Sequence, residues 1–458
     1  MPPDAIKRFR DLLKFVRHRP DLARPSFVVP SRRSEPATPY VALPKRSNQF
    51  LVLFALWLMV FSASSQVIII SPILPRLSEA LDVSESLLGT LVTSYAVMLS
   101  IFALITGPIS DKFGRRRVLL IGSGFMTISL LLHGVADTYL SLLTVRALAG
   151  AAGGTLSGAA VAYVGDYFPY SRRGWANGWI MSGIAVGQIV GIPLGTVLAD
   201  LINYRWPFLM FAVTMGAAFV LIWNVVPQPD VWRDQRKLSI RRASVDYIRL
   251  AKDPVTGAAA AAYFLMFMSI GFYVIYLPAW LERSLDVSSG AIASLFLVGG
   301  LANVVTGPIA GRLSDRVGRK PLIIASCIGL GIVMFATTYV VVNMWIAYIM
   351  FGLAMIMIAM RLSPLQSLLS ALVPDARRGI LMSMAVAVGQ IGIGMSGAIA
   401  GLTYTEFGYK SNSILGAVSI LFMAILVWRG LPEPIDDPQN GESSEADEVL
   451  DVLNVPAR

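Results

Sequence analysis

Long apolar segments recur along the whole chain, each about as long as a helix that crosses a lipid bilayer. A hydrocarbon core needs roughly 20 residues of helix, and in lipid the helix satisfies all of its own backbone polar groups. Hydrophobic residues make up 55% of the 458 residues and charged residues 14%. We therefore predict an all-α polytopic membrane protein with twelve spans, at 50–71, 87–107, 118–136, 139–165, 175–199, 206–227, 257–280, 289–310, 320–342, 344–370, 379–402 and 411–430.

The basic residues are divided unequally between the two sides of these spans. Of the 38 Lys and Arg, 30 fall in the N-terminal tail and in the loops on its side, against Arg76, Arg205, Arg283 and Lys410 in the opposite loops. Basic loops stay cytoplasmic, which predicts a multi-pass protein of the inner or plasma membrane with both termini in the cytoplasm. The net charge of +10 thus reflects topology and does not indicate a nucleic-acid partner.

The ends of the chain and its cysteine content exclude other features. Cys327 is the single cysteine, so neither a disulfide framework nor a thiolate metal site is expected, and no metal or cofactor. Residues 1–48 form a basic tail, in which "AIKRFRDLLKFV" is either an interfacial helix or a solvated segment. The acidic tail, 432–458, has the composition of a disordered segment.

Short motifs return after a nearly constant interval. "LDVS", "RRG" and "VGQI" each occur twice, and "LP" at residue 74 returns at residue 277, with intervals of 202 to 205 residues. Such a period indicates two copies of one structural unit. We expect two pseudo-symmetric six-helix bundles, 49–227 and 257–431, joined by a basic cytoplasmic loop at 228–256, and an even number of spans per half makes the repeats parallel.

The most charged repeat lies between the second and third spans of each half. It reads "GPISDKFGRRR" from residue 107 and "GRLSDRVGRK" from residue 311. We expect its first glycine to allow close approach of neighbouring helices, its second to allow a tight turn, and its Asp and Arg to pair in one conformation and separate in another. The alternative, that the charges only fix topology, needs cations alone. The shared residues are Gly107, Asp111, Gly114 and Arg115, and Gly311, Asp315, Gly318 and Arg319.

The twelve spans, the parallel repeat and the doubled G-x-x-x-D-x-x-G-R pattern together resemble the major facilitator superfamily over about residues 49–431. "RALAGAAGG", which contains Arg146, is similar to the family's second motif, whose arginine is associated with proton coupling. "GIAVGQIVGIPLG", from residue 183, is similar to the fifth-helix motif of drug/proton antiporters and sugar-efflux proteins, which implies roles for Gly187, Gly191, Pro193 and Gly195. We also expect Pro193 to break the fifth helix locally.

The resemblance also implies a conformational latch on the cytoplasmic side. Asp111 and Arg115 would form it, and Asp166 at the end of the fourth helix would complete a charge triad. In the second half Ser370 occupies the position that corresponds to Asp166. We therefore expect an asymmetric latch, tighter in the first half.

Few ionisable groups lie inside the spans, and such groups are functional by default. They are Arg146, Arg361 and His133, and no Asp or Glu lies in the middle of a span. Arg361 is expected either to bind substrate or to bond backbone carbonyls of neighbouring helices. Uncharged polar residues are further candidates for a central cavity, with helix packing as the alternative for each: Gln66, Tyr95, Gln188, Tyr263, Tyr273, Asn303 and Gln390.

Transport is the function that these features favour. We expect alternating access by a monomer in membrane lipid, exporting a neutral or anionic small organic molecule, or several related ones, in exchange for protons. Without a carboxylate within a span, coupling could run through Asp166 or His133. The alternatives are a symporter or facilitator for a sugar or organic anion, a lipid or lysolipid flippase, and a sensor. An enzyme is not expected, because His133 and Asp137 have no accompanying nucleophile and no G-x-x-x-x-G-K loop is present.

Overall fold

The structure, a computed structural model, describes residues 48–229, 240–373 and 375–432. The expectations for both tails fall almost wholly outside these residues. Within them the chain is helical and contains no strand. The first half comprises α2 (Gln49–Ile68), α3 (Ile70–Leu81), α4 (Glu85–Phe113), α5 (Arg115–Leu132), η1 (His133–Val135), α6 (Tyr139–Leu156), α7 (Ala159–Tyr167), α8 (Tyr170–Val186), η2 (Gly187–Gly191), α9 (Ile192–Leu201) and α10 (Trp206–Val225). The second half comprises α12 (Pro254–Val274), α13 (Leu277–Leu285), α14 (Ser289–Val317), α15 (Arg319–Val340), α16 (Met344–Ala371), α17 (Asp375–Phe407) and α18 (Tyr409–Gly430).

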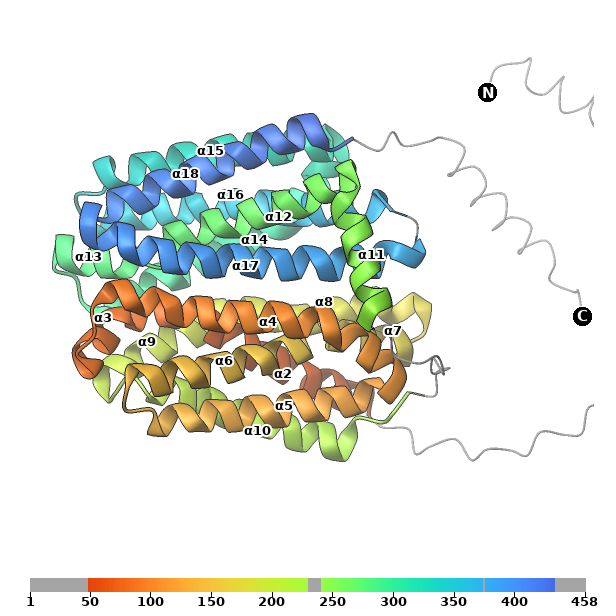
Figure 1. Ribbon diagram of the computed structural model, residues 1–458. Helices are drawn as coiled ribbons and strands as arrows, with labels where there is room; N and C mark the ends of the chain where they lie inside the picture. Colours follow the sequence, from red (N-terminus) through yellow and green to blue (C-terminus); the bar gives the residue numbers. More distant parts are fainter. Residues whose placement is uncertain (1–47, 230–239, 374, 433–458) are drawn as a thin grey trace, which may run out of the picture. The chain divides into compact units, whose positions relative to one another are not determined.

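The expected number of spans is confirmed: within the described ranges, 12 helical segments are long and apolar enough to cross a membrane. They form two bundles that lie side by side, with α4 of the first against α17 of the second (Figure 1). We call the end of the bundles at which residues 48 and 432 lie the terminal end, and the opposite end, with α3 and α13, the distal end. The segment expected as a loop between the bundles contains a helix, α11 (Ile240–Lys252), which crosses the terminal end.

Two spans of the first half are interrupted near their middle, and glycine or proline lies at each interruption. The fourth span divides into α6 and α7 at Gly158, whose φ of 75° is left-handed. In the fifth span the expected break at Pro193 takes the form of a π-helical turn, η2, directly before α9. Both interruptions occur in glycine-rich motifs, and π turns inside helices are frequent at functional sites.

The repeat seen in the sequence extends to backbone angles. Gly114 and Gly318 end α4 and α14 with φ of 98° and 95° and nearly equal ψ of 141° and 147°. At the distal end Asp82 and Asp286, from the two "LDVS" copies, end α3 and α13 in the left-handed region with φ of 51° and 49°. Each tight turn therefore exists in two nearly identical copies.

The first glycine of each charged repeat does not make the close approach that we expected. A Cβ added at Gly107 would meet no atom within 4 Å, and one at Gly311 would meet only Ser363 Oγ at 3.7 Å. The closest helix approaches lie elsewhere. A Cβ at Gly150 of α6 would lie 2.2 Å from the Tyr95 carbonyl oxygen of α4, and one at Gly89 of α4 would lie 1.9 Å from the Gly397 carbonyl oxygen of α17.

Candidate functional site

The side chain of Arg146 lies inside the first bundle and is fully buried. Its Nη1 donates hydrogen bonds to Gln66 of α2, at 3.1 Å to the backbone oxygen and 3.0 Å to Oε1. The guanidinium carbon lies 4.5 Å from the ring centroid of Tyr95 in α4, and Gln66 Nε2 donates to the Tyr95 hydroxyl at 3.2 Å. Gly150 permits this arrangement, because it lets α6 approach the α4 backbone at Tyr95. Three of the candidate residues thus form one cluster.

Part of this cluster has no hydrogen-bond partner. Among the described residues none forms a hydrogen bond with Arg146 Nε, with Arg146 Nη2 or with Nε2 of the buried His133. The His133 ring stacks on Phe208 at 4.2 Å, and its Nδ1 lies 2.8 Å from the Ser129 carbonyl oxygen. A carbonyl only accepts, so this contact assigns the proton to Nδ1 and leaves Nε2 as a bare acceptor. Asp137 instead pairs with Arg205, so it does not form an acid/base pair with His133.

The second buried guanidinium, that of Arg361 in α16, differs from the first. Its side chain is also fully buried. None of its three nitrogens finds a hydrogen-bond partner within the described part of the chain. The carbonyl bonding between helices that we considered for Arg361 is therefore absent there.

The remaining uncharged candidates do not join the Arg146 cluster. The Tyr273 hydroxyl lies 3.0 Å from Thr337 Oγ1, and its backbone oxygen accepts from Tyr409, so Tyr273 has a packing role in the second bundle. Tyr263 OH and Gln390 Oε1 lack partners among the described residues. The others lie half-buried on different helices: Gln188 on η2 and Asn303 on α14.

The terminal end holds part of the expected latch. Arg115 Nε donates to Asp166 Oδ2 at 2.8 Å, which joins the start of α5 to the end of α7. The side chain of Asp111 falls outside the described part of the structure. Neither Asp315 nor Arg319 has an ion pair within the described ranges. The asymmetric latch that Ser370 suggested stays a prediction.

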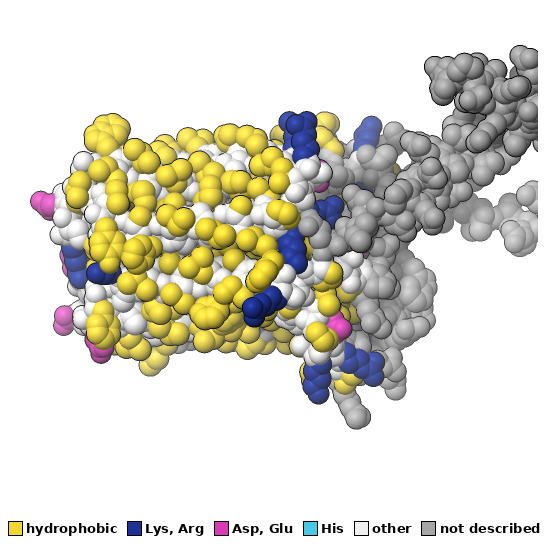
Figure 2. Space-filling view, turned by 90° about the horizontal axis from the view of Figure 1, so that it is seen from above, with side chains coloured by type: hydrophobic (Ala, Val, Ile, Leu, Met, Phe, Trp, Pro, Cys, Tyr) yellow, Lys and Arg dark blue, Asp and Glu magenta, His cyan; other side chains and the backbone are white. Residues whose placement is uncertain are grey.

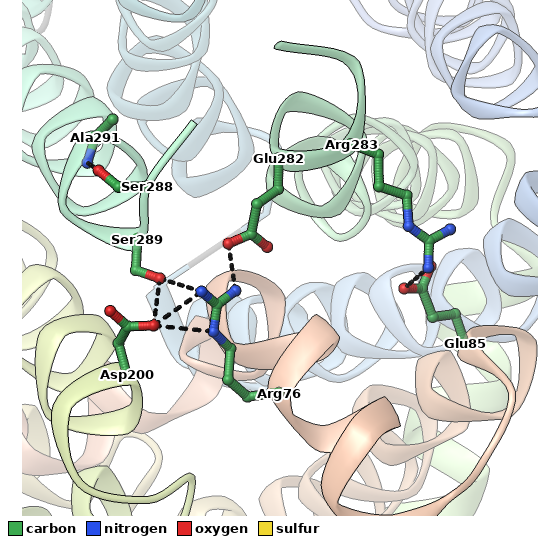
Figure 3. Close-up of polar contacts among 8 residues, drawn as sticks. All are labelled: Arg76, Glu85, Asp200, Glu282, Arg283, Ser288, Ser289 and Ala291. Atoms are coloured by element: carbon green, nitrogen blue, oxygen red, sulfur yellow. Dashed lines mark hydrogen bonds and ion pairs between the residues drawn. The ribbon is translucent and has the colours of Figure 1, made fainter. Parts of the chain in front are cut away.

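The distal end carries an ionic network that the sequence did not reveal (Figure 3). Arg76 of α3 contacts Asp200 of α9 at 2.9 Å through Nη2 and at 3.2 Å through Nε. The same guanidinium pairs with Glu282 of α13 and bonds Ser289 of α14, both in the other bundle. Burial alone would lower the pKa of Arg76, but the hydrogen bonds to Glu282 and Asp200 outweigh it and raise the pKa. Arg76 therefore stays charged at every accessible pH.

A second connection lies beside the first. Arg283 of α13 pairs with the buried Glu85 of α4, and Tyr276 OH donates to the Glu85 backbone oxygen at 2.7 Å. Nearer the midplane, Ser71 Oγ donates to the Val274 backbone oxygen at 2.6 Å. We call the ionic part of these contacts the distal seal, which consists of Arg76, Glu85, Asp200, Glu282, Arg283 and Ser289.

The distal seal was missed because its partners are far apart in sequence. Arg76 and Asp200 are separated by 124 positions, and Arg76 and Glu282 by 206. The sequence shows only four basic residues on the distal side. In the structure three of them, Arg76, Arg205 and Arg283, each pair with an acidic residue. Nothing in the sequence specifies which acidic residue each one meets.

Comparisons with known proteins agree with this architecture. The family model described as Major Facilitator Superfamily matches residues 56–261 and again 259–456. A multidrug resistance protein of Proteus mirabilis, MdtG, is 26% identical over 85% of this chain and 98% of its own length. An uncharacterized MFS-type transporter of Bacillus subtilis, YwfA, is also 26% identical, over 84% of this chain and 93% of its own length. A crystal structure of a D-xylose–proton symporter superposes with a TM-score of 0.72 at 20% identity, covering 84% of this chain and 99% of that one, which shows a common fold.

Proposed function

The chain belongs to the major facilitator superfamily, and we propose that it exports a small organic molecule by alternating access in exchange for protons. The distal seal carries this proposal. Its ion pairs Arg76–Glu282 and Arg283–Glu85 each join one bundle to the other, so they form only when the distal side is closed. A two-bundle protein with such a breakable closure can expose a central site to each side in turn.

Two observations support an orientation with the terminal end in the cytoplasm. Lys and Arg side chains gather at that end of the apolar surface in Figure 2, while acidic and a few basic side chains appear together at the distal end. The same bias in the sequence follows the positive-inside rule. In this orientation the distal seal faces the cell exterior, and the Arg115–Asp166 pair belongs to the cytoplasmic latch.

The direction of transport rests on the fifth span. The glycines of its motif pack against α2, where a Cβ at Gly191 would lie 2.4 Å from Ser65 Oγ. The π turn also meets the second bundle, because Gly300 of α14 faces the backbone of Ile189. This helix is therefore an element on which the two bundles rock, as expected for the antiporter motif that it resembles. The relative MdtG, a multidrug resistance protein, supports export.

The substrate class follows from the charges in the interior. Two guanidinium groups are fully buried, and in the described spans no carboxylate lies at mid-depth to balance them. A cation entering this interior would be repelled, since charge interactions are strong at low dielectric. A neutral or anionic substrate fits better, and Arg146 with Gln66 and Tyr95 forms the coupling cluster.

Proton flux in proteoliposomes tests the proposal. With an internal pH dye and an imposed pH gradient, we expect a neutral or anionic compound to dissipate the gradient. Arg146→Ala should reduce that flux at least tenfold, because it removes the charge at the centre of the Gln66 and Tyr95 contacts. Arg429→Ala, which changes an exposed residue at the terminal end of α18, is the matched control and should retain flux.

One alternative has an observation in its favour. The absence of a carboxylate at mid-depth in the described spans would suit a facilitator that moves solute without protons. If labelled solute crosses the wild-type vesicles while the internal pH stays constant, the facilitator replaces the antiporter. If only lipid crosses, the chain is a flippase.

A further inference from the structure

The unpaired guanidinium of Arg361 requires a physical explanation. An arginine cannot lose its proton in a protein, and a buried charge is normally paired with an opposite charge and hydrogen-bonded. Arg146, equally buried, has two hydrogen bonds and an aromatic face. Arg361 has none of these among the described residues, although it carries three nitrogens with five N–H donors.

The second bundle supplies no carboxylate for this charge. Its acidic residues all lie at helix ends or in loops: Glu282, Asp286, Asp315, Asp375 and Glu406. Arg361 lies in the interior of α16, 17 residues from the start of that helix and ten from its end. The ionisable group that interacts with it is the thiol of Cys327 in α15, which is a poor counterion. Among the described residues of the second bundle, no carboxylate balances this charge, so the site has room for an anion from outside the chain.

The surroundings of Arg361 indicate what kind of anion would fit. The same helix carries four methionines, at 350, 355, 357 and 360, and such side chains adapt to apolar ligands of varied shape. A guanidinium fork with flexible apolar walls suits a planar carboxylate attached to an apolar body.

We propose that Arg361 is the binding site for the carboxylate of an amphipathic organic acid, which the transporter carries as substrate. This inference rests on the proposed transport function and narrows its substrate class. The carboxylate accepts two parallel N–H bonds from the guanidinium, and its apolar body lies among the methionines of α16. The site is distinct from the Arg146 cluster, which lies in the other bundle.

Binding to the purified full-length protein tests this directly. We use benzoate and phenylacetate as probes, with benzamide and phenylacetamide as neutral counterparts of nearly the same shape, and follow the thermal unfolding midpoint. The acids should raise the midpoint of the wild type, whereas the amides should leave it unchanged. In Arg361→Met the affinity for the acids should fall at least tenfold, and Arg361→Lys should lie between, since it keeps the charge but loses the fork. Arg429→Gln, on the terminal end of α18, is the control.

The same variants separate a ligand site from a structural role. An unpaired buried charge destabilises the empty protein, so without ligand Arg361→Met should unfold at the same or a higher temperature than the wild type. A structural bond would give a lower midpoint, and that result overturns the proposal. It is equally overturned if neither acid stabilises the wild type, or if both stabilise Arg361→Met as well as the wild type.

Two further arms identify the anion and its relation to transport. If chloride alone gives the Arg361-dependent stabilisation and the acids add nothing in saturating chloride, an inorganic anion holds the site and the carboxylate assignment fails.

In vesicles, Arg361→Met should lose flux with acids while retaining flux with neutral compounds. Loss of all flux would instead show that Arg361 serves the transport cycle and would overturn the substrate assignment. If the wild type moves no protons, the antiport proposal fails while the binding result still stands. The two proposals can therefore fail independently.

Discussion

At the residue scale, two glycines differ in how well they should tolerate substitution. Gly114 ends α4 with φ of 98° and ψ of 141°, a region that residues with a Cβ rarely adopt, and an added Cβ would lie 2.8 Å from the Gln228 side chain. Gly174 lies within α8 with nothing within 4 Å of its Cβ position. The backbone, and not the available space alone, decides which glycine is required.

We therefore expect Gly114→Ala to destabilise the protein by about 1–3 kcal/mol, the usual cost of holding a residue in such a strained conformation. Gly318→Ala should behave alike, because its φ is 95°. Gly174→Ala, the control, should be neutral or stabilise by up to roughly 1 kcal/mol, since alanine favours helix. Thermal unfolding in detergent measures all three, and an unchanged midpoint in Gly114→Ala would refute the strain argument.

At the element scale, the lengths of the apolar segments located the spans. They did not show where a span is interrupted or which helices pack together. The sequence predicted twelve spans and a break at Pro193, and both were found. It did not predict the division of the fourth span at Gly158, because nothing in a glycine-rich segment shows which glycine adopts a positive φ. Nor did it identify Gly89 and Gly397 as the closest crossing of the bundles, since no offset in the sequence relates α4 to α17.

That crossing gives a prediction about conformation. In Gly89→Ala the new methyl group would lie 1.9 Å from the Gly397 carbonyl oxygen, so the distal-closed state should lose stability relative to the distal-open state. In a Cys327→Ser background, a cysteine introduced at the buried Ser71 reports distal opening by its reaction with an impermeant maleimide. We expect labelling to accelerate several-fold in Gly89→Ala. Gly107→Ala, in the same helix with open space around it, should leave the rate unchanged; equal rates in both variants would contradict the argument.

At the scale of the whole molecule, the distal seal links the two bundles, whose buried apolar residues form one continuous core. The sequence singled out Gln66, Tyr95 and Arg146 one by one, but it did not predict that they form one cluster. That cluster, and the pairing of Arg283 with Glu85, depend on how the helices pack in three dimensions. The absence of partners around Arg361 could likewise be seen only in the folded chain.

The seal predicts a salt-dependent equilibrium. Arg283 is 62% exposed on its side chain and Glu85 only 4%, so their pair should contribute about 1 kcal/mol, roughly a fivefold bias toward the closed state. Arg283→Gln should increase labelling of the Ser71→Cys reporter by that factor, and raised salt should do so in the wild type but little further in the variant. Lys410→Gln, which removes a cation stacked on Tyr339 within the second bundle, is the control. Salt-independent labelling in the wild type would show that the pair does not hold the seal.

The two buried guanidiniums also bear on the energy source of the cycle. If a monovalent carboxylate leaves the cell while one proton enters, each turnover moves the equivalent of two positive charges inward. The membrane voltage, at about 2.3 kcal/mol per charge for every 100 mV, then drives export in addition to the pH gradient. With such an exchange, a protein whose described interior holds fixed positive charge and no balancing carboxylate at mid-depth would expel an acid even when the pH on both sides is equal.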